Sequence, residues 1–154
     1  MASRIARRAI FALPKVPADD RAAMLAICDT LDALCRDGGA ATAKMSALYD
    51  QATAWRGGIA GAAAEALYWA IDATASADAA NDFPIDQTCI DDVQKAFAAA
   101  SAAEGMSPLQ IRLYAAADLD QLRFACGEAG IGFYDALGPQ VMGRLAPVYP
   151  PDAR

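Results

Sequence analysis

The segment from Ile59 to Phe83 constrains the fold of this chain more than any other stretch. Its sequence is IAGAAAEALYWAIDATASADAANDF, which places small or apolar residues on nearly every side of a helical wheel. Only a narrow polar stripe interrupts it, formed by Glu65, Asp72 and Ser76 at positions i, i+7 and i+11. A helix with so little polar surface is normally buried by its neighbours. The segment therefore predicts a central helix, against whose alanines other helices pack closely.

The rest of the chain predicts an all-α fold. Amphipathic segments cover 18–37 and 40–55 before the central helix, and a segment ending at Glu104 and another over 107–126 follow it. The eight prolines and 11 glycines lie mostly between these segments. A chain of 154 residues is long enough for one domain and too short for two ordinary ones. We therefore expect a single α-helical domain over 1–154, a bundle of about five main helices with a proline-rich extended tail over 146–154.

Two of these helices are predicted to form the centre of the bundle. The segment 107–126 begins with a capping serine, Ser107, and a proline at the first helical position, and it carries apolar residues on two sides. A helix that is apolar on two faces usually lies between layers. We therefore expect 59–83 and 107–126 to be the central pair, with Leu67, Leu122 and Phe97 in the core.

Residues 1–16 form a basic N-terminal segment. Up to residue 15 it carries no acid and four basic residues: Arg4, Arg7, Arg8 and Lys15. Its apolar run is too short for an export signal, so we expect a short helix that packs Ile5, Ala9 and Leu13 inward. A transit peptide or a membrane-surface anchor is the alternative reading of such an arginine-rich start. No charge-free apolar run reaches the roughly 20 residues that span a bilayer, and we expect no membrane partner.

The rest of the chain is strongly acidic. The net charge of the whole chain is −6, so the residues after the +4 N-terminal segment carry −10. This charge argues against nucleic acid as a partner and favours a basic protein, although acidic surfaces also simply keep proteins soluble. The highest density of acids surrounds Pro84 and includes no basic residue: Asp78, Asp82, Asp86, Asp91 and Asp92. We predict that this segment contacts the partner; the alternative is that its aspartates cap helix ends.

Few residue types in this chain can do chemistry. There is no histidine, which excludes the familiar catalytic triads and the usual zinc ligand sets. The four cysteines, Cys28, Cys35, Cys89 and Cys126, form no CxxC pair. We expect no metal and no cofactor. Cys28 and Cys35 lie on the apolar side of the segment 18–37 and are expected to be small core residues, and free buried thiols favour the cytoplasm.

These observations favour a binding protein over an enzyme. We expect a non-enzymatic acidic helical interaction module, of the immunity or inhibitor type, that binds a basic protein partner. The first alternative is a small enzyme that uses the carboxylates placed next to apolar surface, Glu65, Asp72 and Asp118. The second is a structural or assembly subunit that uses the basic N-terminal segment as an arm. Homodimer formation is left open.

Overall fold

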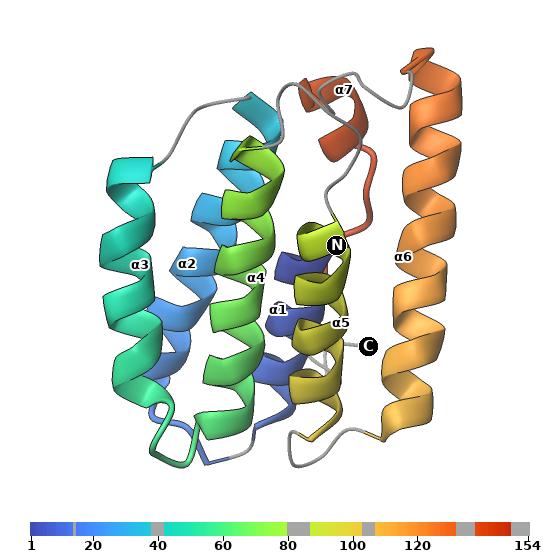
Figure 1. The fold of residues 1–154 in the computed structure, drawn as a ribbon. Coiled ribbons are helices and arrows are strands. Elements are labelled where there is room, and N and C mark those ends of the chain that lie inside the picture. Colours follow the sequence, from blue (N-terminus) through green and yellow to red (C-terminus); the bar gives the residue numbers. More distant parts are fainter. Residues whose placement is uncertain (14, 38–41, 80–86, 103–106, 132–137, 149–154) are drawn as a thin grey trace.

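The computed structural model describes residues 1–13, 15–37, 42–79, 87–102, 107–131 and 138–148. Within these ranges the chain forms helices and no strand, which confirms the all-α prediction (Figure 1). The helices are α1 (Ala2–Ala12), α2 (Ala18–Asp37), α3 (Thr42–Trp55), α4 (Gly61–Ala79), α5 (Gln87–Ser101), α6 (Pro108–Ala129) and α7 (Gly138–Met142).

Helix α4 is the centre of the bundle, as its composition predicts. It packs most extensively against α5, α1 and α3 (Figure 1). Leu67 and Ile71 are fully buried, and so are the alanines between and beside them. Alanine brings the neighbouring helices close to the α4 backbone, because its side chain is a single methyl group. None of the described helices, α4 included, combines the length and apolar character that crossing a membrane requires.

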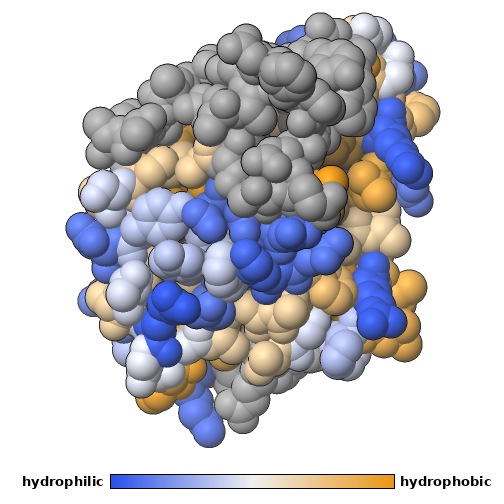
Figure 2. All heavy atoms as spheres, in the orientation of Figure 1, coloured by the Kyte–Doolittle hydropathy of each residue, from blue (hydrophilic) through white to orange (hydrophobic). Residues whose placement is uncertain are grey.

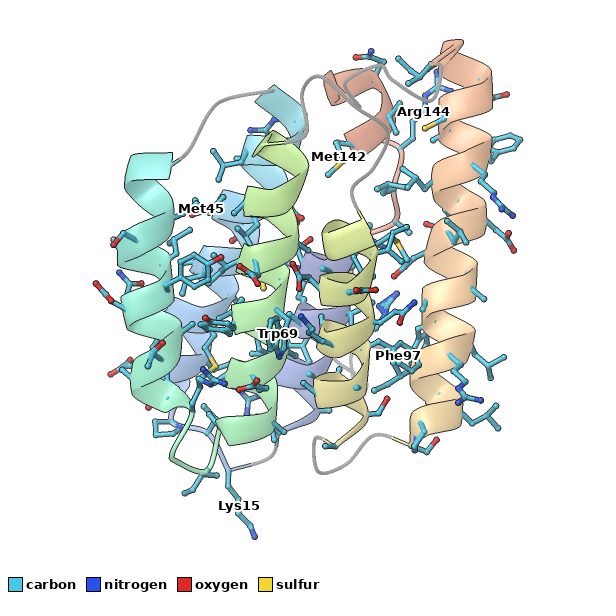
Figure 3. All side chains as sticks on the ribbon, in the orientation of Figure 1. Lys15, Met45, Trp69, Phe97, Met142 and Arg144 are labelled. Atoms are coloured by element: carbon cyan, nitrogen blue, oxygen red, sulfur yellow. The ribbon has the colours of Figure 1, made fainter. Side chains whose placement is uncertain are left out.

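Helix α1 lies inside the bundle, behind α4 and α5 in Figure 1. Ile5 and Ala9 of α1 are buried, and so is Leu13 directly after it, which confirms the inward packing predicted for these three residues. It also packs against α2. Three helices therefore surround the basic N-terminal segment, and it is a core element of the fold. Lys15, just after α1, points away from the bundle (Figure 3).

Helix α6 is peripheral, which corrects the prediction that 107–126 belongs to the central pair. It stands at the edge of the bundle and contacts α7 and α5 (Figure 1). Its buried residues are Ile111, Asp118 and Ala125, which form one line along the helix. Leu122 is only half-buried, while Leu113 and Phe124 are exposed. Only one of the two apolar faces of α6 meets the bundle. The helix that packs against α4 at the centre is α1 instead.

Phe97, the third predicted core residue, is half-buried and packs against the core. It extends from α5 toward α6 (Figure 3).

The ends of α6 agree with the sequence. Ser107 and Gln110 form a reciprocal capping box, with Pro108 in the first turn, and Gly130 ends the helix in the left-handed conformation with a φ of 66°.

Candidate functional site

The most concentrated group of paired charges lies where α1 meets α6. Arg4 and Arg8 stand one turn apart on α1, so both side chains reach the same point on the neighbouring helix. That point is Asp118. Its Oδ1 lies 2.7 Å from Nη2 of Arg4, and its two oxygens each lie 2.8 Å from Nη2 of Arg8. The aspartate side chain is 1% exposed, so two arginines hold a carboxylate that is shielded from water.

Further contacts fix the two arginines in place. Nη2 of Arg4 also donates a hydrogen bond to the backbone oxygen of Ala146, at 2.8 Å. The guanidinium of Arg8 lies over the ring of Tyr114, 4.7 Å from its centroid. Within the described residues, the Nε atoms of both arginines are buried without a hydrogen-bond partner. Two positive charges against one negative charge at a buried site make the fold dependent on that carboxylate.

The third arginine of α1 faces the opposite side and pairs with α2. Nη2 of Arg7 lies 2.9 Å from Oδ2 of Asp32 and 3.0 Å from Oδ1 of Asp29. The hydroxyl of Ser3 donates to the other oxygen of Asp32, at 2.5 Å. All three arginines of α1 are therefore neutralised by aspartates of α2 or α6.

A cleft of about 520 Å³ opens beside these ion pairs, between α1, α2 and the C-terminal segment. It is lined by Arg4, Arg7, Asp29, Asp32, Arg36, Met142, Gly143, Leu145, Pro147 and Val148. Although three arginines line it, Arg4 and Arg7 are already held by carboxylates. The charges that line the cleft are therefore of both signs and largely paired with one another. Two arginines without carboxylate partners would bind a small polar ligand better.

The three carboxylates of the predicted polar site lie in separate surroundings. Asp118 belongs to the arginine cluster just described. Glu65 accepts a hydrogen bond from Nε1 of Trp69, at 2.8 Å, and Asp72 accepts one from the hydroxyl of Tyr49. Burial and this hydrogen bond raise the pKa of the Tyr49 phenol. Each carboxylate is thus engaged by its own partner, and among the described residues no hydrogen bond joins any two of them.

The predicted acidic contact segment is described only in part. Asp82 and Asp86 lie outside the described residues, as does the side chain of Asp78, although its backbone belongs to α4. Asp91 is half-buried. Asp92 is 1% exposed, and its Oδ1 lies 3.0 Å from Nζ of the lysine three residues later, Lys95. One of the five predicted contact residues therefore faces the bundle.

Charged groups also pack on aromatic rings along α4. Nζ of Lys95 lies 4.2 Å from the centroid of the Trp69 ring, so this lysine joins Asp92 to α4. The guanidinium of Arg56 lies 4.6 Å from the centroid of Tyr68 and pairs with Glu65 through its Nε, at 2.5 Å. Lys95 therefore ties α5 to α4, and Arg56 ties the turn after α3 to α4. Both cations are also paired with a carboxylate.

The arginine cluster is the feature that sequence reasoning missed. The spacing of Arg4 and Arg8 indicates that both lie on one face of a helix, and Asp118 lies at the edge of an apolar stripe. The sequence contains both signals, but neither one identifies the residue with which the arginines or the aspartate pair. The groups are separated by 110 or more residues along the chain, and periodicity reports only on the local helix.

The cysteines are free where the structure describes them, and no group of three or more potential metal-binding side chains occurs there. Cys28 is fully buried, as predicted, beside the Arg7 ion pairs. Cys35 is exposed, which corrects its predicted place in the core. It lies in the last turn of α2, where the helix extends past its buried stripe.

The buried thiol of Cys28 predicts a loss of stability at alkaline pH. Burial raises its pKa to about 12, whereas the thiol of the unfolded chain ionises near its ordinary value of about 8.5. Below that value both states hold the proton. Above it the unfolded state loses the proton first, so the free energy of unfolding should fall by up to about 1.4 kcal/mol per pH unit.

Urea denaturation between about pH 8 and 10 measures this fall. The Cys28→Ala variant should show a flatter pH dependence than the wild type, and a Cys35→Ala variant should flatten it less, because Cys35 is exposed and burial raises the pKa of its thiol less than that of Cys28. Equal slopes in the wild type and the Cys28→Ala variant would contradict this account of the thiol.

Comparisons with models of protein families, with curated protein sequences and with solved structures find no match to this chain.

Proposed function

We propose that this protein is a non-enzymatic, acidic helical interaction module that binds a basic protein partner, as immunity proteins and inhibitors do. The observation that supports it best is the internal use of the arginines of α1. Arg4 and Arg8 pair with Asp118, and Arg7 pairs with Asp32 and Asp29.

These ion pairs decide which charges a partner would meet. The three arginines contact three aspartates, Asp118, Asp32 and Asp29, inside or beside the bundle. Of the 13 basic and 19 acidic side chains of the chain, 10 and 16 then remain for the other surfaces, which therefore keep the net charge of −6. Such a surface attracts cationic partners and speeds their association.

The proposed contact region is the acidic segment from Asp78 to Asp92. Within it Asp92 pairs with Lys95 and is buried, so we assign it to the fold. Asp78, Asp82 and Asp86 are the residues that we propose meet the partner, with Asp91 at the border of the contact.

The alternative of a carboxylate enzyme has less support. A general acid or base needs a carboxyl group that can reach a substrate proton. Glu65, Asp72 and Asp118 are instead each held by an arginine, a tryptophan or a tyrosine. The alternative of an assembly subunit with a basic arm also has less support, because α1 packs inside the bundle and does not form an arm.

Affinity capture from the native host with the full chain as bait tests the proposal. We expect capture of a basic protein that is released as ionic strength rises, because salt screens exposed charges over about 8 to 10 Å. A bait with Asp78, Asp82 and Asp86 changed to asparagine should retain at least about tenfold less of this partner.

The matched control is a bait with three exposed aspartates of other surfaces changed to asparagine: Asp19, Asp50 and Asp120. It has the same net charge as the first variant. We expect it to capture the partner as the wild type does. If both variant baits capture equally less of the partner, net charge alone explains the effect and the acidic segment is not the contact region. Capture that does not depend on salt would contradict a basic partner.

A further inference from the structure

Helix α6 presents a large apolar face to the outside of the bundle. The exposed fractions of Leu109, Leu113 and Phe124 are 66%, 62% and 68%. Single exposed apolar residues are common, but three large ones on one helix are the usual mark of an interaction surface. In Figure 2, apolar and charged patches alternate along the right-hand edge, where Figure 1 places α6.

Leu109, Leu113 and Phe124 lie on one stripe along the exposed side of the helix, and the other exposed large apolar residues, Tyr114 and Leu119, lie outside it. Positions 109, 113, 116, 120 and 124 follow one another at intervals of three or four residues, so they share a face. The residues buried against the bundle, at positions 111, 118 and 125, lie on the opposite side. The stripe has a small residue at its middle, Ala116, and a large apolar residue at each end, Leu109 and Phe124.

This stripe is complementary to itself when it is reversed. Leu109 and Phe124 lie at nearly equal distances from the point between Ala116 and Ala117, and they are about 22 Å apart along the helix. Arg112 and Asp120 stand four residues to either side of Ala116. Both are exposed, and neither makes an ion pair with another described residue of this chain.

We propose that α6 pairs with α6 of a second copy of this chain, antiparallel, around a two-fold axis close to Ala116. Such an axis brings Leu109 of each copy to Phe124 of the other, and Arg112 to Asp120. A two-fold interface uses the same patch on both subunits, so each of these contacts forms twice. The small side chains of Ala116 and Ala117 allow the helices to approach to about 8 Å where they cross.

The charges favour a second copy over an unrelated partner. Asp120 lies within the stripe on one side of its centre, Arg112 borders the stripe on the other side, and Arg123 borders it beside Phe124. A uniformly basic partner would place like charge opposite Arg112, and a uniformly acidic partner would place like charge opposite Asp120. The reversed copy meets an opposite charge at both places. The surface is separate from the acidic segment of the proposed function, and the inference does not rest on it.

Sedimentation equilibrium of the full chain, over about a hundredfold range of concentration, tests the pairing. We expect a reversible dimer in the wild type and a monomer in the Phe124→Asp variant. The matched control is Ile59→Asp, because Ile59 is 69% exposed but lies before α4, outside the stripe. A wild type that stays monomeric throughout, or a control that dissociates as fully as Phe124→Asp, would overturn the proposal.

Exchanging the two charges distinguishes the proposed geometry from any other self-association. Arg112→Asp and Asp120→Arg should each weaken the dimer by about tenfold or more, since each places like charges opposite one another. The double variant R112D/D120R restores opposite charges and should dimerise nearly as the wild type does. Circular dichroism confirms that each variant is folded. A double variant no tighter than the single ones would overturn the antiparallel register.

Discussion

Replacing Asp118 with alanine is expected to lower the free energy of unfolding by about 3 to 5 kcal/mol. The substitution leaves the guanidinium groups of Arg4 and Arg8 buried without the carboxylate that compensates them. It also removes the main polar connection between α1 and α6, a helix with few other contacts to the bundle. Urea denaturation measures the effect.

Asp50→Ala is the matched control for that substitution, because it removes the same side chain from a position on α3. Asp50 is exposed, so its loss should change the free energy of unfolding by no more than about 0.5 kcal/mol. Similar losses in the two variants would mean that Asp118 is not held as described here.

Truncating Leu67 to alanine is expected to destabilise the protein by about 2 to 5 kcal/mol. Leu67 is fully buried in the middle of α4, so its truncation leaves a cavity in the core. Leu122→Ala should cost clearly less, since Leu122 of α6 is half-buried. A larger loss in the free energy of unfolding for Leu67→Ala than for Leu122→Ala is expected if α4 and α1 form the centre of the bundle. Equal losses are expected if α4 and α6 form it.

The control for both leucines is Ile59→Ala, at a position before α4 that is 69% exposed. We expect it to stay within about 0.5 kcal/mol of the wild type in chemical denaturation. A loss at Leu122 equal to that at Leu67 would restore the central pair that the sequence pattern suggested.

The sequence predicted those features that depend on neighbouring residues. The composition of 59–83 identified α4 as a buried helix, because an apolar circumference leaves no side for water. Ser107 and Pro108 located the start of α6, because capping is decided within one turn of a helix terminus.

The sequence did not predict features that depend on contacts between distant segments. An outward stripe such as that of Leu113 and Phe124 has the same periodicity whether the bundle or another molecule covers it, so α6 was assigned to the centre. The partner of Arg4 and Arg8 lies 110 or more residues away on another helix, and no local pattern identifies it.

Sequence patterns also give a side chain's position on a helix more readily than its burial. Asp92 belongs to a dense acidic segment, which favours an exposed assignment. Its burial becomes clear only with Lys95 on the next turn and Trp69 of α4 in place, since the three groups pack together.

The central claim is that the basic N-terminal helix is an interior element whose arginines are neutralised within the fold. Native-state hydrogen exchange of the wild-type chain tests it most directly. The amides of α1 should open with a free energy close to that of the amides of α4, near the free energy of global unfolding, while those of α6 should open more easily. Exchange of the α1 amides as rapid as that of an unstructured peptide would contradict the claim and return the N-terminal segment to the status of an arm.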